Sequence, residues 1–269
     1  MSSRNNNSIV KTSTNSDGIL RIILNNPKNH NVLSEDMMLN MQLALDEAAA
    51  DKKIRVIIIS AEGSTFSAGH DLKELKAGRK NPDKGKGYFK EVMFKCSKLM
   101  QSIVNNPKPV IAEVAGVATA AGCQLVASCD LAYAGESARF ATPGVNIGLF
   151  CSTPMVALSR NISNKHSMEM LLTGDLISSS KAAEIGLINK MINDNDLQNF
   201  VLERALKISK KSAITLKIGK EAFYKQIDMT LSEAYDYASN VMVENMLKLD
   251  AEEGIDAFIN KRTPNWQDK

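Results

Sequence analysis

The amino-acid sequence predicts an α/β fold in which crossover helices join mostly parallel strands. Short apolar runs suited to buried strands alternate with longer segments whose apolar residues recur every three or four positions. From about Leu197 onward only the helical period continues. We therefore expect a polar, disordered lead-in over residues 1–17, a core over residues 18–196 and an all-helical region over residues 197–269.

The core elements follow from these patterns in chain order. Gly18–Leu24 is expected to be a strand, and Ser34 is expected to cap the helix that follows. That helix would bury one face made of Met38, Met41, Leu45 and Ala48. The next expected elements are a buried strand, a helix, a strand and a short helix, at Ile54–Ser60, Tyr88–Val104, Pro109–Val114 and Ala121–Ser128.

Four helices are expected in the C-terminal region, near Leu197–Lys210, Thr215–Ile227, Leu231–Leu249 and Ala251–Lys261. Their apolar side chains need a surface to cover them, either from the core or from another subunit. We therefore expect oligomerisation.

The composition of the chain indicates which kinds of partner and cellular compartment are expected. The 33 Lys and Arg and 30 Asp and Glu give a net charge of +3 over 269 residues, which favours neither nucleic acid nor membrane as a partner. Four cysteines without C-x-x-C spacing indicate reduced thiols in a cytosol-like compartment. No apolar run is long enough for a membrane span, and the polar N-terminus has no secretory h-region. No metal-ligand pattern stands out.

Two small-residue loops suggest a site that holds an oxygen atom. Ala118, Ala120, Ala121 and Gly122 lie between an expected strand and an expected helix, where a ligand could approach the main chain and the free N–H groups of the helix start. The segment Ser64–Lys73 has the same design around Ala68 and Gly69. Two N–H donors from two loops would form an oxyanion hole.

Motifs along nearly the whole chain resemble the crotonase superfamily, also called the enoyl-CoA hydratase/isomerase family. The matching segments are NPKNHNVLS, FSAGHDLKEL, PVIAEVAGVATAAGCQLVASCDLA, FATPGVNIGL, LLTGDLISSSKAAEIGLINKMI and EGIDAFINKRTPNW. The resemblance implies a ClpP/crotonase-like spiral of ββα turns with a C-terminal helical region that forms trimers or dimers of trimers. It also implies an acyl-coenzyme A thioester as substrate with no permanently bound cofactor, an enolate intermediate, and the mitochondrial matrix if the source is eukaryotic.

The resemblance assigns roles to particular residues. The oxyanion donors would be the backbone N–H groups of His70 and Ala121. Coenzyme A would contact Lys28, His30 and Val32 in one segment and Ala68, Asp71, Leu72 and Lys73 in another, with Lys261 or Arg262 near a phosphate. For three features a plainer reading stands beside the functional one, and we favour the plainer reading in each. Asp71 would be a helix cap, and the His70 ring would pack beneath its loop. The basic loop Lys76–Gly87, which could attract coenzyme A phosphates, would be a mobile, solvated connection.

The chain departs from the family at both positions of the paired hydratase glutamates, which are Gln124 and Gly144 here. Glutamine does not exchange protons at neutral pH, and glycine has no side chain to do so. Ordinary hydration is therefore not expected, and the segments around both positions most resemble one subgroup of the family that shares these losses. Gln124 could orient water or a substrate carbonyl, or could be bonded to neighbouring main chain.

Replacement groups would come from the segment after Gly144. Ser152 falls where some family members place a catalytic side chain, and Cys151 is a candidate nucleophile, although no nearby His or Lys would lower its pKa. The sequence FSAGHD also resembles methylmalonyl-CoA decarboxylases of the family, but Cys151 stands where those enzymes have a tyrosine. The alternatives are thus a decarboxylase-like enzyme or a catalytically silent acyl-CoA-binding protein.

Overall fold

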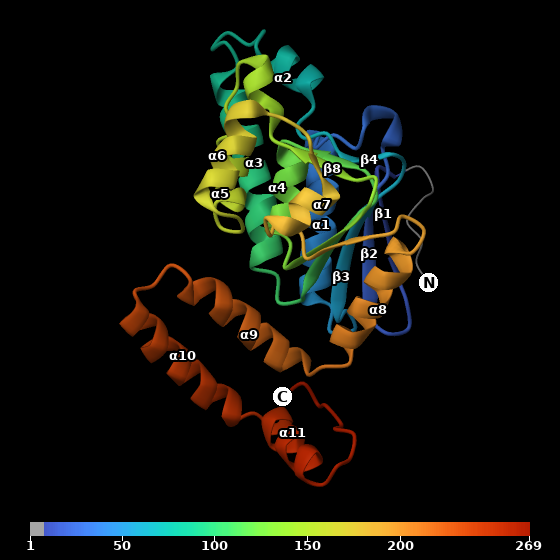
Figure 1. The fold of residues 1–269 in the computed structure, drawn as a ribbon, viewed down its shortest axis with the longest axis vertical. Coiled ribbons are helices and arrows are strands. Elements are labelled where there is room, and N and C mark those ends of the chain that lie inside the picture. The colour runs from blue at the N-terminus through green and yellow to red at the C-terminus, as the bar shows by residue number, and fades with distance from the viewer. Residues whose placement is uncertain (1–7) are drawn as a thin grey trace.

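The computed structural model describes residues 8–269, which form an α/β body and a protruding helical arm (Figure 1). The body contains a six-stranded sheet in the order β1-β2-β3-β5-β7-β10 and a four-stranded sheet in the order β4-β6-β8-β9. Only the β1–β2 and β8–β9 pairs are antiparallel. The large sheet comprises β1 Val10–Thr14, β2 Ile19–Leu24, β3 Val56–Ala61, β5 Val110–Val114, β7 Leu131–Gly135 and β10 Lys190–Ile192, and the small one β4 Thr65–Ser67, β6 Val117–Thr119, β8 Arg139–Ala141 and β9 Ile177–Ser178.

Helices cover both faces of the large sheet. Ile57 and Ile59 of β3 face the main core, whereas Val56 and Ile58 face a second apolar cluster on the other side. The body's helical segments are η1 Pro27–Asn29, α1 Glu35–Ala50, α2 Leu72–Gly78, α3 Lys86–Val104, α4 Ala121–Ser128, η2 Pro143–Ile147, α5 Pro154–Leu158, α6 Asn164–Thr173, α7 Ser179–Glu184 and α8 Leu197–Ser209. This layered α/β architecture confirms the predicted fold class.

The local predictions for the core hold closely. The Ser34 hydroxyl accepts a hydrogen bond from the Met37 N–H (3.2 Å) at the start of α1, and the four residues predicted for its inner face are buried. Helix α4 has the predicted bounds, Ala121–Ser128. The predicted helix over Tyr88–Val104 begins two residues earlier, at Lys86.

Two predicted boundaries need correction. Residues 1–7 of the expected lead-in lie outside the described residues, but Val10–Thr14 form β1, so the lead-in prediction is wrong there. This strand pairs only with β2 at the edge of the sheet, where polar residues remain in contact with solvent. Helix α8 begins where the separate helical region was expected, yet Leu197, Val201 and Ala205 pack on the large sheet, which places α8 with the core.

The arm consists of α9 Ala213–Gln226, α10 Leu231–Met246 and α11 Leu249–Ile259. It extends below the body in Figure 1, and none of its helical residues before Asp250 is buried. Large apolar side chains remain exposed along it, among them Phe223, Leu231, Tyr235, Met242, Leu247 and Phe258. Within the described residues, no helix is both long and apolar enough to cross a lipid bilayer.

Candidate functional site

The two small-residue loops meet at one edge of the small sheet. Strands β4 and β6 are parallel neighbours, so their carboxyl ends lie together. Gly69, which follows β4, has φ +86°, and a Cβ atom there would lie 2.9 Å from the Ala120 Cβ and 3.1 Å from the Ala121 nitrogen. The loops are thus in direct contact, and no side chain fits between them.

The main-chain nitrogens of His70 and Ala121 are both available to a ligand. Neither donates a hydrogen bond to any residue that the structure describes. Ala121 is the first residue of α4, so its N–H has no partner within the helix. Since this helix end carries partial positive charge, an oxygen anion would be stabilised beside it.

Backbone strain marks the turn into α4. Ala120 has φ 49° and ψ −119°, a conformation that costs a non-glycine residue about 1–3 kcal/mol. Its N–H donates to the Ala141 carbonyl (2.9 Å), and its carbonyl accepts from the Gln124 N–H (3.0 Å). These bonds hold the turn in the conformation that presents the Ala121 N–H.

The His70 ring is buried beside the same loop, and neither ring nitrogen has a hydrogen-bond partner among residues 8–269. Burial lowers the pKa of His70, and the nearby Leu33 carbonyl opposes that shift only in part. The ring is therefore neutral at physiological pH. Its burial agrees with the predicted packing beneath the loop, while its unpaired nitrogens leave a donor and an acceptor free.

Gln124 lies on α4, one turn after Ala121, and lines a cavity of about 980 Å³ between the body and α9. Its side chain is buried, with 5% of its surface exposed, and its Oε1 has no hydrogen-bond partner in the described part of the chain. The reading in which this oxygen is bonded to neighbouring main chain is therefore wrong. A buried amide oxygen without a protein partner can receive a hydrogen bond from a ligand or from water that reaches it.

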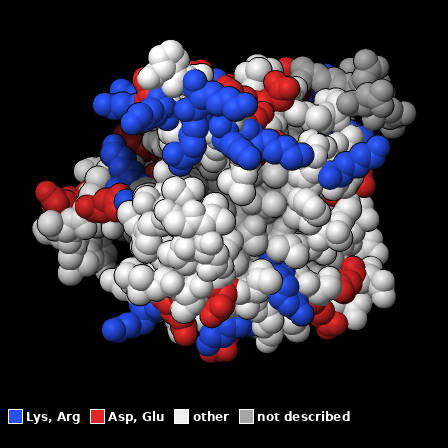
Figure 2. All heavy atoms as spheres, turned by 90° about the horizontal axis from the view of Figure 1, so that it is seen from above, with Lys and Arg blue, Asp and Glu red and all other residues white. Residues whose placement is uncertain are grey.

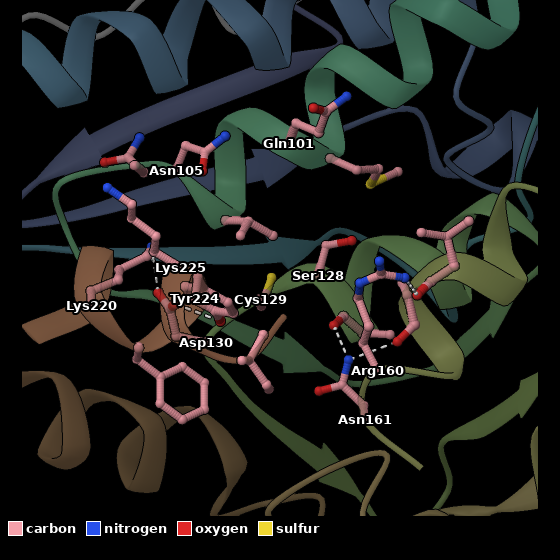
Figure 3. Close-up of a pocket in the computed structure, with 18 of the residues that line it drawn as sticks. Gln101, Asn105, Ser128, Cys129, Asp130, Arg160, Asn161, Lys220, Tyr224 and Lys225 are labelled. Atoms are coloured by element: carbon pink, nitrogen blue, oxygen red, sulfur yellow. Dashed lines mark hydrogen bonds and ion pairs between the residues drawn. The ribbon is translucent and has the colours of Figure 1, made fainter. Parts of the chain in front are cut away.

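Figure 3 shows the part of this cavity where α9 reaches the body. Lys220 of α9 forms an ion pair with Asp130 (2.7 Å), and the Tyr224 hydroxyl donates to the same carboxylate (2.9 Å). Burial raises the pKa of the Asp130 carboxyl, and the Lys220 ion pair opposes this effect. The sequence analysis missed this cluster, for which the only signal was an aspartate between two apolar elements.

Position 144, the second of the two positions where the family resemblance implied a glutamate, has no room for a side chain. Gly144 lies in η2, where an added Cβ would be 2.6 Å from the Leu149 carbonyl oxygen and 2.8 Å from the Cys151 Sγ. Burial raises the pKa of the Cys151 thiol above its ordinary value, which favours the protonated form at neutral pH. Ser152 is exposed, and its hydroxyl donates only to the Phe150 carbonyl (3.3 Å).

The two segments predicted for coenzyme A lie side by side, because the Leu33 N–H donates to the Gly69 carbonyl (2.7 Å). Buried Asn31 holds the first segment against β4 through hydrogen bonds to the Glu62 and Thr65 carbonyls. The sequence analysis did not single out Asn31. Around it, Lys28 and His30 are exposed and Val32 is half-buried.

In the second segment, Ala68 is half-buried and Leu72 and Lys73 are exposed. The Asp71 carboxylate accepts from the Lys73 N–H (2.7 Å), which confirms the predicted helix cap. Arg262 of the C-terminal segment is held in ion pairs with Glu253 and Asp256, so it is not a free cation for a phosphate.

Comparisons with known proteins identify the family of the chain. A family model described as enoyl-CoA hydratase/isomerase matches residues 14–269. The mitochondrial enoyl-CoA hydratase domain-containing protein 3 of Xenopus laevis is 51% identical over 93% of this chain and 83% of its own length, and that of Homo sapiens is 48% identical over 93% and 81%. Among solved structures, a Mycobacterium smegmatis enoyl-CoA hydratase superposes with a TM-score of 0.92 (41% identity, 96% of this chain and 98% of that one). The human domain-containing protein 3 superposes with a TM-score of 0.91 (47% identity, 96% and 100%).

Proposed function

Because the chain belongs to the enoyl-CoA hydratase/isomerase family, we propose that it acts on an acyl-CoA thioester and stabilises an enolate. The backbone N–H groups of His70 and Ala121 would bind the thioester oxygen as negative charge develops on it. One oxyanion-hole donor typically contributes about 3–4 kcal/mol of transition-state stabilisation.

One observation carries the proposal: two loops far apart in sequence meet with both of these N–H groups unbonded within the described residues. The strained turn at Ala120 supports it, because such strain persists where surrounding contacts enforce it and is concentrated at functional sites.

Coenzyme A would lie along the adjacent segments that contain Lys28, His30, Val32, Ala68 and Lys73. The acyl group would extend toward Gln124, which lines the cavity and whose Oε1 has no hydrogen-bond partner in the described residues. In this proposal Gln124 orients a water molecule or a substrate group by hydrogen bonding and transfers no proton.

Hydration is not the reaction that we propose, since it needs a base that activates water and an acid that protonates the α-carbon. Gln124 and Gly144 supply neither, and burial favours the protonated form of Cys151. An isomerisation through an enolate needs one group that takes the α-proton and returns it at the γ-carbon. The neutral His70 ring, which has an unpaired acceptor nitrogen, would serve as that group in place of a carboxylate pair.

The absence of carboxylates at these two positions favours decarboxylation as a second candidate. In a malonyl-type thioester, breaking the bond to the carboxylate releases CO₂ and leaves its electron pair as the enolate. No base is needed, and a proton from water then completes the product. An oxyanion hole without a carboxylate pair suits this chemistry.

We further propose that the exposed apolar side chains of α9, α10 and α11 are covered in a homotrimer or a dimer of trimers. Burial of such surface contributes about 25 cal/mol per Å², and Phe258, for example, is 86% exposed in the single chain. The relatives' names include "mitochondrial", and four free buried cysteines suit a reducing compartment such as the mitochondrial matrix.

A substrate panel tests the proposal. The purified chain would be assayed with crotonyl-CoA, a 3-enoyl-CoA and methylmalonyl-CoA, and coenzyme A binding would be measured by calorimetry. We expect turnover of the second or third substrate and little hydration of the first. Hydration of crotonyl-CoA at the rate of a glutamate-bearing hydratase would contradict the reasoning about positions 124 and 144. Binding without turnover of any substrate would instead identify a silent acyl-CoA-binding protein.

A further inference from the structure

Positive charge is concentrated in the segment that contains α2, the following turn and the start of α3. Between residues 72 and 90, seven Lys and Arg residues stand against two acidic residues, giving a local net charge of +5, whereas the whole chain has +3. The seven, which we call the basic patch, are Lys73, Lys76, Arg79, Lys80, Lys84, Lys86 and Lys90, and all are exposed. Figure 2 looks onto this end of the molecule and shows Lys and Arg side chains gathered along one side of it.

The charges of the basic patch are not neutralised by neighbouring acids. No member forms an ion pair with a residue in the described range. The Asp83 carboxylate accepts from the backbone N–H groups of Gly85 and Gly87 (2.9 and 2.7 Å). The Glu74 carboxylate accepts from the Glu35 N–H (3.1 Å). Both acids therefore support the local backbone and leave the cations without an acidic partner, while the Arg79 guanidinium lies 5.3 Å from the Phe89 ring centroid.

Packing gives the basic patch a defined frame. Gly78 ends α2 directly against the Tyr88 ring, so closely that an added Cβ would lie 2.2 Å from it. Gly85 has φ 86° at the start of α3, where a side chain would collide with the Phe89 ring. The turn between the helices is thus held at both ends, and the cations lie on a preformed surface.

Two apolar side chains flank these cations. Leu72 is 55% exposed and Phe94 is 67% exposed, and the Lys90 ammonium lies 5.9 Å from the Phe94 ring centroid. Exposed apolar side chains among lysines suit the interface of a lipid bilayer. There the apolar side chains enter the boundary between headgroups and acyl chains, while the lysines contact anionic headgroups. The phosphates of a nucleic acid would bind the lysines and arginines, but they would make no favourable contact with the apolar side chains of Leu72 and Phe94.

We propose that the basic patch, with Leu72 and Phe94, docks the protein peripherally on an anionic lipid bilayer. Because the net charge of the whole chain is close to zero, its composition alone does not indicate this basic surface. Docking does not depend on the proposed catalysis. It would, however, bring the adjacent site to a surface where acyl thioesters, being amphiphilic, accumulate.

Vesicle flotation tests this proposal with the full chain and two charge-matched variants. The patch variant carries Lys80→Glu, Lys84→Glu and Lys86→Glu, and the control carries Lys52→Glu, Lys165→Glu and Lys207→Glu at exposed positions elsewhere. Lys73 is left intact because it also belongs to the segment implied for coenzyme A. Vesicles of phosphatidylcholine alone are compared with vesicles that also contain phosphatidylglycerol.

The wild-type chain should float only with the anionic vesicles and should be released as salt rises, since the Debye length falls from about 8 Å at 0.15 M to about 3 Å at 1 M. Each Lys or Arg near an anionic surface contributes about 1 kcal/mol, so the patch variant should lose at least ~100-fold in partitioning. The control variant should change less than about tenfold, through net charge alone.

A Phe94→Ser variant separates lipid docking from general attraction to polyanions. It should weaken vesicle binding while leaving retention on double-stranded DNA unchanged. Absence of wild-type binding to anionic vesicles, equal losses in both charge variants, or tight binding to DNA alone would overturn the proposal.

Discussion

Replacement of Gly69 by alanine tests the proposed oxyanion hole most directly. At φ +86° an L residue costs about 1–2 kcal/mol. The new Cβ would also lie 2.9 Å from the Ala120 Cβ and 3.1 Å from the Ala121 nitrogen, well inside the ~3.5–4.0 Å optimum for carbon atoms. The loops must therefore separate by roughly 0.5–1 Å, and overpacking of this kind costs about 1–3 kcal/mol.

This displacement separates the two N–H groups that would share one oxygen. Because a misplacement of about 1 Å can cost ~100-fold in rate, we expect kcat for the panel substrate that turns over to fall at least ~100-fold. The free energy of unfolding, measured by urea titration, should fall by about 2–5 kcal/mol. Circular dichroism at the assay temperature would show that the variant remains folded.

Gly186→Ala is the matched control, since Gly186 has the same φ of +86° and the nearest contact of an added Cβ is 3.6 Å away, at the Asn161 carbonyl oxygen. It should lose about 1–2 kcal/mol of stability and keep its kcat. If folded Gly69→Ala turns over as fast as Gly186→Ala, the convergence of these amides on one oxygen is not what drives the reaction.

Three further predictions concern buried groups. Lys220→Met leaves Asp130 buried without its cation, so urea titration should show a loss of about 3–5 kcal/mol; an added Asp130→Asn change should recover part of it, and a negligible first loss would contradict a stabilising role. His70 is held neutral by burial, so the unfolded chain binds its proton more readily; stability should therefore fall as pH drops below 6.5, the ordinary pKa of histidine, by at most about 1.4 kcal/mol per pH unit. His70→Phe should flatten that part of the pH profile, and an unchanged profile would show that the ring titrates normally. Cys151 should resist iodoacetamide at pH 7.5 until denaturant is added, and Cys151→Ala should keep turnover; rapid alkylation of the folded chain, followed by mass spectrometry, would restore the thiolate hypothesis.

The sequence pattern predicted those features that interactions within a few residues determine, namely helix starts, helix caps and buried helix faces. Ser34 followed by a helical apolar face fixed the start of α1, and the small residues from Ala118 to Gly122 fixed the turn into α4. These predictions succeeded because caps and apolar faces act within one or two turns of chain. The same holds for Asp71, whose capping bond reaches only to Lys73.

Contacts between distant segments were beyond such reasoning. The edge strand at Val10–Thr14 is polar and becomes regular only through pairing with β2, so its sequence resembles a tail. Helix α8 has the same period as the arm, and only the sheet beneath Val201 distinguishes it. The pairing of Asp130 with Lys220, 90 residues apart, has no local signal at all.

The close packing around Gly144 limits which side chains this position can hold. Because the Leu149 carbonyl and the Cys151 sulfur occupy the volume that even one methyl group would need, no single substitution could place an acid there. The loop would have to change its conformation first. Variants with a side chain at position 144 in the present loop would be destabilised by about 1–3 kcal/mol through overpacking and would not gain catalytic activity. A carboxylate at position 144 would thus require several coordinated changes in the 143–153 loop, so any reaction of the present protein has to proceed without an acid at that position.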